Sequence, residues 1–291
     1  MSNIRSSLFQ GFSLETTAKD VSRLLQAKAL LPTDIPVNIA FISNESYAER
    51  LAAVEALRAA GARPRPIISA RRITSPEVLR SYLTQAVEVG QVRGVFLVGG
   101  DPAGPQGPFT DSMDVINGRF LDGLAIETVG IPGYPEGHPR ITDEVLWDYL
   151  RRKVDALTAK GFKVEITTQL SFDTDAVIRW IEQVRQAGIH VPIRVGIPGP
   201  SNMTGLLNFA RQCRVGTSAQ LLHRYGWQVT SLLGTEGPER FLTTLLQRMA
   251  LHDLGELHLH IYTLGDISRA IQWFQDYEQR APGLSAQTLP L

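Results

Sequence analysis

The stretch Gly94–Pro102, G-V-F-L-V-G-G-D-P, decides how the rest of this sequence is interpreted. Its apolar run lacks polar alternation, which is typical of a strand in a parallel sheet that is covered on both faces. The run stops abruptly at two glycines, an aspartate and a proline. A carboxylate there belongs either to a turn or to a ligand site at a strand end.

Similar apolar runs recur along the chain and are separated by segments with helical periodicity. We predict eight strands: Phe12–Glu15, Val37–Ile42, Arg65–Ser69, Val92–Val98, Leu124–Ile131, Lys163–Thr168, Ile193–Ile197 and Glu256–Thr263. Tyr47–Ala60 is predicted as a helix that stops at Gly61. Ser75 with Pro76, and Thr142, are predicted to open two more helices, and Ser201–Asn202 a fourth.

Eightfold alternation of strand and helix predicts an α/β fold, a (β/α)8 TIM barrel formed by residues 1–291 as one domain. A doubly wound sheet gives the same alternation. The barrel is favoured because no Gly-x-Gly-x-x-Gly follows an early strand and because polar residues end many different strands. Residues 218–251 are longer than one connection needs, so we expect extra helices before the last strand.

Composition narrows the class of protein. Lysine and arginine total 29, as do aspartate and glutamate, so the net charge is zero and nucleic-acid binding is not expected. A single cysteine, Cys213, gives neither an intrachain disulfide nor a Cys-x-x-Cys site. No apolar run is long enough for a signal peptide or a membrane span, so we expect a soluble, cytoplasmic protein.

In a barrel, the carboxyl ends of the strands meet at one mouth. The predicted ends are Glu15, Ser43–Asn44, Ser69–Arg71, Gly99–Asp101, Pro132–Pro139, Thr167–Asp173, Ile197–Asn202 and Tyr262–Leu264. Taken singly, each has a structural interpretation, such as a turn at Gly99–Asp101. No metal site is predicted, because histidines 258 and 260 on the last strand are more typical of core packing. Glycines at two strand ends favour close approach of a flat or phosphorylated cofactor.

Three motifs resemble the methylenetetrahydrofolate reductase family: V-G-I-P-G-Y-P-E-G-H-P (129–139), I-T-T-Q-L-S-F-D (166–173) and H-I-Y-T-L (260–264). The likeness spans nearly the whole chain and covers the family's catalytic barrel. It implies an FAD-bearing TIM barrel that passes hydride from flavin N5 to methylenetetrahydrofolate, giving 5-methyltetrahydrofolate, or runs the reverse reaction. It also implies a place in one-carbon metabolism and methionine biosynthesis.

The resemblance assigns roles to individual residues. Glu15 matches the general acid, and Asp101 matches the carboxylate beside the flavin. Gln169 matches a pterin-binding residue, and Tyr262 and Met203 fall at further substrate-binding positions. Lys153 matches a lysine that meets the FAD phosphates, with Lys160 as a rival. The expected cofactor-binding set is Ser43, Ser69, Arg71, Gly99, Gly100, Asp101, Ser112, Tyr134, His138 and Lys153.

The sequence also departs from the family pattern. Gly99 stands where a basic residue is usual, and Leu170–Ser171 where aromatics are usual. Met203 replaces an aromatic that helps to hold the nicotinamide, so NADH or NADPH as the electron donor is left open. A flavin-free folate-binding methyltransferase and an inactive partner subunit are the alternatives. A homo-oligomer is compatible with the sequence but not indicated by it.

Overall fold

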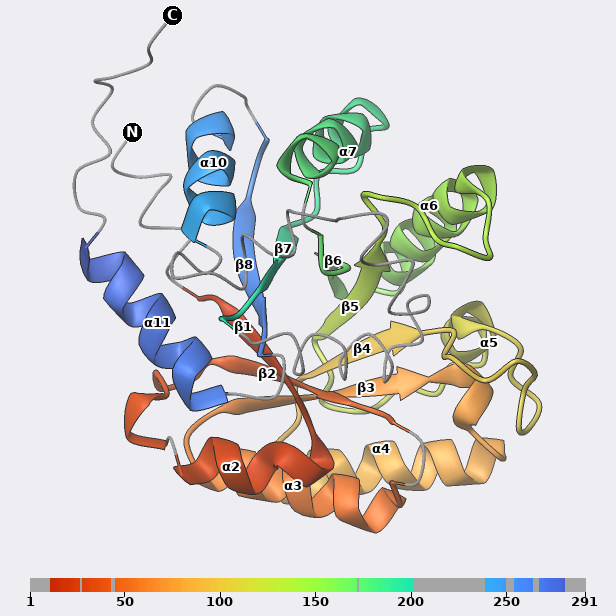
Figure 1. Cartoon of the computed structure of the whole chain (residues 1–291). Helices are drawn as coiled ribbons and strands as arrows, with labels where there is room; N and C mark the ends of the chain where they lie inside the picture. The colour runs from red at the N-terminus through yellow and green to blue at the C-terminus, as the bar shows by residue number, and fades with distance from the viewer. Residues whose placement is uncertain are drawn as a thin grey trace, which may run out of the picture.

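The computed structural model describes residues 11–26, 28–42, 45–171, 173–200, 239–249, 254–263 and 267–280. Within this part, eight parallel strands follow one another in chain order, and the last pairs with the first to close a barrel (Figure 1). The strands are β1 (Ser13–Thr17), β2 (Pro36–Ala40), β3 (Arg63–Ser69), β4 (Gly94–Val98), β5 (Thr128–Gly133), β6 (Lys163–Thr168), β7 (Ile193–Pro198) and β8 (Leu257–Tyr262).

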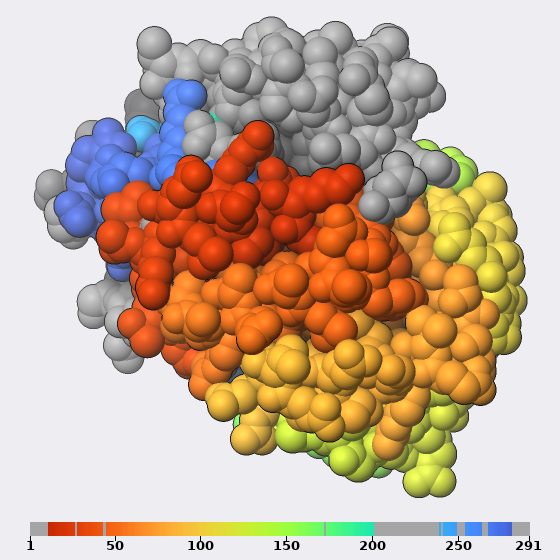
Figure 2. Space-filling view, turned by 90° about the horizontal axis from the view of Figure 1, so that it is seen from below, coloured from red at the N-terminus to blue at the C-terminus, as the bar shows by residue number. Residues whose placement is uncertain are grey.

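Helices surround this barrel and cover the outward faces of the strands (Figure 1). They are η1 (Ala18–Asp20), α2 (Val21–Gln26), η2 (Lys28–Leu30), α3 (Tyr47–Ala59), η3 (Ala70–Arg72), α4 (Pro76–Gly90), α5 (Ser112–Asn117), α6 (Asp143–Ala159), α7 (Thr174–Gln186), α10 (Glu239–Met249) and α11 (Ile267–Arg280). Seen from below, the segments from α2 to α5 form one continuous surface (Figure 2).

The predicted TIM barrel is confirmed, and the closed sheet excludes the doubly wound alternative. All eight predicted strands overlap observed ones. The fifth begins at Thr128, four residues later than predicted, because residues 118–123 form turns and residues 124–125 a bend. Arg119 and Gly123 have φ of 59° and 73° there, in the left-handed region. The extra helices predicted within residues 218–251 fall mostly outside the described residues.

Helix boundaries follow the predicted signals. Ser75 caps α4, its hydroxyl accepting the backbone N–H of Val78 at 3.3 Å, and Pro76 takes the first helical position. Thr142 precedes α6 as predicted, but its side chain makes no capping bond. The predicted start at residues 201–202 lies outside the described part of the chain.

The barrel interior combines one large aromatic with buried charges. Phe96 of β4 fills the space above Gly130 of β5, where a Cβ atom would come within 2.3 Å of its ring. Glu165 of β6 accepts bonds from Arg65 at 2.7 Å and from Arg194 at 2.9 Å. Arg194 also donates to the carbonyl of Gly11, just before β1, at 2.7 Å. This ionic cluster therefore lies toward the amino-terminal ends of the strands, below the mouth.

Opposing effects act on the acid of this cluster. Burial raises the pKa of Glu165, but the two guanidinium groups outweigh it and hold that pKa well below its usual range. Buried ion pairs of this kind need excellent geometry to offset desolvation. Two arginines against one carboxylate leave this part of the interior positively charged. This charge acts on the pKa of His260, which lies nearer the mouth.

Candidate functional site

A buried line of polar side chains leads from the barrel interior to Glu15. The imidazole of His260 lies between the two, with Nδ1 2.8 Å from the Ser13 hydroxyl and Nε2 3.7 Å from Glu15 Oε2. The His260 side chain is fully buried, whereas that of Glu15 is 19 % exposed. Glu15 is thus the solvent-facing end of this line.

The protonation of His260 follows from its surroundings. Burial lowers the pKa of His260, the charges of Arg194 and Arg65 act in the same direction, and the Glu15 carboxylate opposes them. The imidazole is therefore neutral near pH 7 and carries one N–H. Ser13 can donate either to Nδ1 or, at 3.5 Å, to the Leu259 carbonyl, so Nδ1 of His260 has a partner in both tautomers. Nε2 makes no hydrogen bond among the described residues.

Tyr262 forms the wall beside this line. Its ring meets His260 edge-on, with centroids 4.8 Å apart, and its hydroxyl donates to the Thr168 carbonyl at 3.1 Å. A Cβ at position 196 would come within 2.7 Å of the ring, so Gly196 permits this crossing from β8 to β6. The predicted substrate residue Gln169 follows Thr168 directly, and its backbone N–H donates to the Gly133 carbonyl at 2.8 Å.

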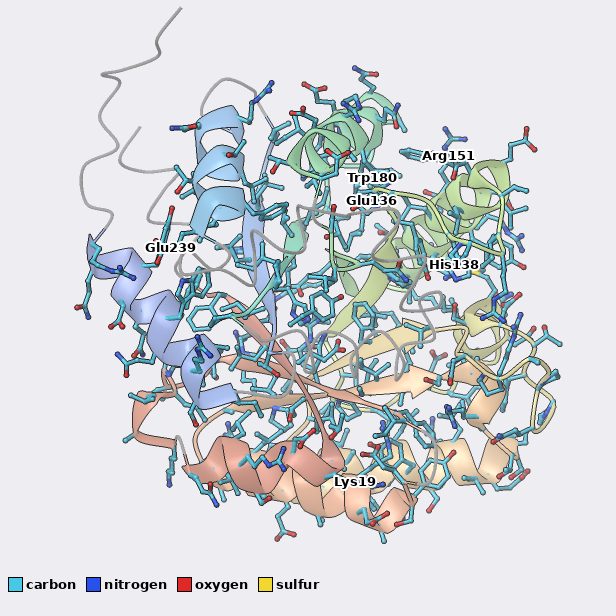
Figure 3. All side chains as sticks on the ribbon, viewed as in Figure 1. Lys19, Glu136, His138, Arg151, Trp180 and Glu239 are labelled. Carbon is cyan, nitrogen blue, oxygen red and sulfur yellow. The ribbon has the colours of Figure 1, made fainter. Side chains whose placement is uncertain are left out.

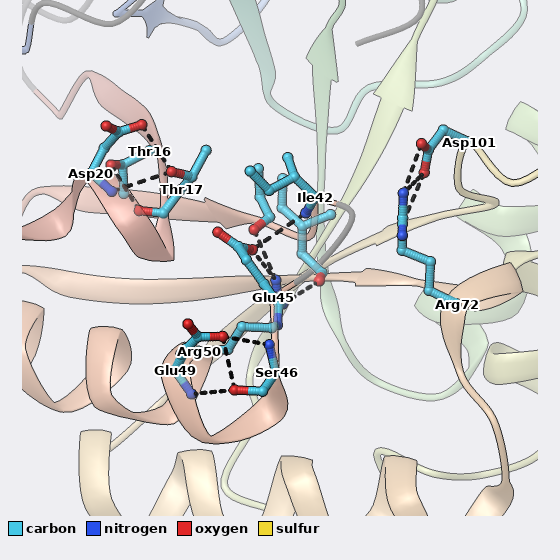
Figure 4. Close-up of polar contacts among 12 residues, drawn as sticks. Thr16, Thr17, Asp20, Ile42, Glu45, Ser46, Glu49, Arg50, Arg72 and Asp101 are labelled. Carbon is cyan, nitrogen blue, oxygen red and sulfur yellow. Dashed lines mark hydrogen bonds and ion pairs between the residues drawn. The ribbon is translucent and has the colours of Figure 1, made fainter. Parts of the chain in front are cut away.

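Asp101 follows β4 and is held by a bidentate ion pair. Arg72 Nε and Nη2 donate to its two carboxylate oxygens at 2.9 and 2.7 Å (Figure 4). The neighbouring Gly100 has φ of 95°, a conformation that favours glycine, and would place a Cβ 3.2 Å from Ser69. The candidates Ser69, Gly99 and Gly100 therefore lie around Asp101 at the ends of β3 and β4.

Sequence reasoning chose Arg71 and missed Arg72. The Arg71 guanidinium donates to the carbonyl oxygens of Thr110 at 2.8 Å and Pro102 at 3.5 Å, so it fastens the loop after β4. The two arginines are adjacent in η3, and the backbone turn sends them in different directions. No sequence signal separates their roles.

The loop after β5 carries Tyr134, Glu136 and His138. Figure 3 labels Glu136 and His138. The rings of Tyr134 and His138 meet edge-on at 5.6 Å. Burial raises the pKa of Tyr134 to about 12 and lowers that of His138, where the charge of Arg140 adds to the effect. Ser171 donates a hydrogen bond to Glu136, which ties the β6 loop to the β5 loop. This serine is one of the departures noted in the sequence.

Lys153 lies on the inner side of α6 and is buried. Its Nζ is 5.7 Å from the centre of the Tyr149 ring, and the Tyr149 hydroxyl donates to Asp111 at 2.7 Å. Burial lowers the pKa of Lys153 to about 8, opposed by the charge of Asp111. Lys153 forms no ion pair within the described residues. The Ser112 hydroxyl, next to Asp111, is buried without a partner there.

The direction of α6 separates Lys153 from Lys160. The helix begins near the mouth, after β5, and ends where β6 begins, at the opposite end of the barrel. Lys160 follows its last residue, about 10 Å further along the axis than Lys153, and is exposed beside Lys163. Side chains of a helix point back toward its amino terminus, which for Lys153 is toward the mouth.

Two candidates, Ser43 and Met203, lie outside the described residues. Among the residues that are described, no group of three histidine, cysteine, aspartate or glutamate side chains is placed to hold a metal ion. The described helices include none that is both long and apolar enough to cross a membrane.

Comparison with known proteins places the chain in a family. The family described as Methylenetetrahydrofolate reductase matches residues 73–272, more than half of the chain. This chain belongs to that family. The resemblance of the strand-end motifs to methylenetetrahydrofolate reductases is thereby confirmed.

Individual relatives of this family match only in part. Methylenetetrahydrofolate reductase (NADH) 1 of Arabidopsis thaliana is 29 % identical over 215 residues, 65 % of this chain and 34 % of the relative. Methylenetetrahydrofolate reductase 2 of Saccharomyces cerevisiae is 34 % identical over 161 residues, 53 % of this chain and 25 % of the relative. The matched part of the chain therefore spans between a quarter and about a third of these relatives' length.

A solved structure shares the barrel. The protein is an uncharacterized one from Clostridium thermocellum that binds two copies of 5-methyl-5,6,7,8-tetrahydrofolic acid. It superposes with a TM-score of 0.60 at 12 % identity, covering 96 % of this chain and 98 % of that one. At this identity, the likeness concerns the fold.

Proposed function

We propose that the chain is a flavin-dependent oxidoreductase that interconverts 5,10-methylenetetrahydrofolate and 5-methyltetrahydrofolate. The observation that carries this proposal is the line Ser13–His260–Glu15, which ends in a carboxyl group at the mouth of a barrel of this family. Both relatives are named as methylenetetrahydrofolate reductases, which supports the substrate class. The folate-binding protein from Clostridium thermocellum has the same fold.

Glu15 is the proposed general acid. Opening the five-membered ring of methylenetetrahydrofolate requires a proton on N10, and a carboxyl group at the mouth supplies it. His260 lies behind Glu15 and accepts or donates one proton according to its tautomer. His260 Nε2 lies 3.7 Å from Glu15 Oε2, beyond hydrogen-bond distance, so we propose that the imidazole is a polar neighbour that bonds the carboxyl group once the two move closer. Burial lowers the pKa of His260, so this neighbour stays neutral near pH 7.

The residues around the mouth fit FAD as the cofactor. Lys153 is a buried cation without an ion pair among the described residues, as a phosphate-binding lysine would be before its ligand is bound. A Cβ at Gly99 would meet no atom within 4 Å in the part of the chain that the structure describes, which fits the approach of a flat ring to the backbone there. When bound, FAD supplies the hydride.

Each side chain then has a task of its own. Asp101, fixed by Arg72, is proposed to face the pyrimidine edge of the flavin. Tyr134 and His138 are proposed to line the flavin and Lys153 to bind the phosphates. Gln169 is proposed to bind the pterin, with Tyr262 as the adjoining wall. NADH and NADPH are both candidate donors, and the pathway is proposed to be one-carbon metabolism.

Anaerobic mixing of the purified chain with FAD separates this proposal from its alternatives. FAD should bind at micromolar concentration with a shift of its absorbance, and 5-methyltetrahydrofolate should bleach it. Bleaching by NADH or NADPH identifies the donor. Binding of 5-methyltetrahydrofolate without FAD would favour the methyltransferase, and binding of neither ligand an inactive subunit. Either result would overturn the proposed function.

A further inference from the structure

Arg72 makes the most regular ion pair near the mouth. Its guanidinium faces the Asp101 carboxylate in a parallel, two-bond arrangement of 2.9 and 2.7 Å (Figure 4). The Arg72 side chain is only 8 % exposed and that of Asp101 27 % exposed. A bidentate pair of this geometry fixes both the place and the orientation of the carboxylate.

A stack of side chains supports the arginine from behind. The Arg72 guanidinium lies 5.6 Å from the centre of the Phe41 ring, and that of Arg50 lies 4.2 Å from the same ring. Arg50 is fully buried and donates to the carbonyl oxygens of Ala40 and Ile67, at the ends of β2 and β3. Arg72 is therefore anchored to the barrel through these contacts as well as by its own position in η3.

A basic side chain at position 99 could also pair with Asp101, but this chain has a glycine there. Gly99 precedes Asp101 by two residues, and a Cβ there would meet no atom of the described residues within 4 Å. The described residues therefore leave room for a side chain at this position. The positive charge that balances Asp101 comes instead from η3, which follows the neighbouring strand β3.

We propose that Arg72 is a positioning residue that orients the Asp101 carboxylate and neutralises it at the flavin edge, so that the bound cofactor meets a neutral pair. This inference rests on the proposed function. A lone carboxylate would disfavour the negative charge that collects on the pyrimidine ring when flavin is reduced. The pair removes this penalty, so the enzyme holds reduced flavin more tightly than the same site without Arg72 would.

The test compares the dissociation constants of oxidised and reduced FAD in four variants. Arg72→Gln removes the charge and leaves a shorter polar side chain with an amide donor. It should weaken the binding of reduced FAD, relative to the binding of oxidised FAD, by roughly tenfold. Arg72→Lys keeps the charge, so its ratio of the two dissociation constants should stay within about threefold of the ratio for the parent chain. The double variant Arg72→Gln with Asp101→Asn is again neutral and should return to near the parent ratio.

A matched control lies at the amino-terminal end of β4, the strand that Asp101 follows. Arg93 pairs with Glu127 at 2.9 Å, where both side chains are more than half exposed. Arg93→Gln should leave the ratio unchanged. An unchanged ratio in Arg72→Gln, or an equal change in Arg72→Lys, would overturn the role of Arg72 while leaving the proposed function intact. Failure of the unaltered chain to bind FAD would overturn both.

Discussion

Replacing Lys153 with methionine should make the protein without FAD more stable and its complex with FAD weaker. The methionine side chain is similar in length and fills the same apolar space, but it carries no charge. Burial lowers the pKa of Lys153 from its ordinary value of 10.5 to about 8. At 1.36 kcal/mol per pKa unit, the charged amine destabilises the FAD-free fold by roughly 3 kcal/mol below pH 8.

The pH dependence of stability has a definite sign. Between pH 8 and 10.5 the unfolded chain holds a proton on Lys153 that the folded chain has lost, so folding stability rises with pH in this window. Lys153→Met should remove that rise and add up to about 3 kcal/mol of stability at pH 7. Urea unfolding at pH 7, 8.5 and 10 measures both effects.

FAD binding should respond in the opposite direction. If the amine meets the phosphates, its removal weakens FAD binding tenfold or more, since hydrogen bonds to charged groups contribute about 1.5–3 kcal/mol. Lys160→Met is the matched control, because this lysine is exposed at the far end of α6. A stability loss at pH 7 in Lys153→Met, or unchanged FAD affinity, would refute the reasoning.

Three further substitutions test other parts of the account. His260→Asn should slow reduction of methylenetetrahydrofolate about tenfold or more and change its pH profile while leaving FAD affinity intact; an unchanged profile would remove His260 from the proton path. Gly130→Ala should destabilise the barrel by about 1–3 kcal/mol, measured by urea unfolding, because the new methyl group meets the Phe96 ring; undiminished stability would show that the core can yield. Glu165→Gln should destabilise by about 3–5 kcal/mol near neutral pH, where two buried arginines lose their partner. Because the pKa of Glu165 is depressed, that difference should shrink as the pH falls below about 4.5, and a difference that is constant down to pH 2 would contradict the assigned pairing.

The fold was predictable because the strands are rich in apolar residues and largely buried on both faces. In β4 and β7, consecutive buried residues face the barrel interior and the helices in turn, so the sequence contains a strand signal without alternation. The start of β5 was placed too early because Leu124 and Ile126 are apolar, although they belong to the irregular segment before the strand. Periodicity alone does not reveal such tertiary use of apolar residues.

The sequence predicts which residues lie at the strand ends, but not which side chains contact one another there. Glu15, Asp101 and Gln169 were found there because a barrel gathers these ends. The choice between Arg71 and Arg72 depended on the backbone path of η3, to which adjacent identical residues give no clue. His260 was assigned to packing, and its alignment with Glu15 depends on the β1–β8 register that closes the barrel.

Single-turnover reduction of methylenetetrahydrofolate by the Glu15→Gln variant tests the central claim most directly. The variant should bind FAD and accept electrons from any donor that reduces the parent chain, and it should then fail to pass hydride to the folate. Glu127→Gln, exposed at the opposite end of the barrel, should behave like the parent. Hydride transfer by Glu15→Gln at the parent rate would contradict the assignment of Glu15 as the general acid.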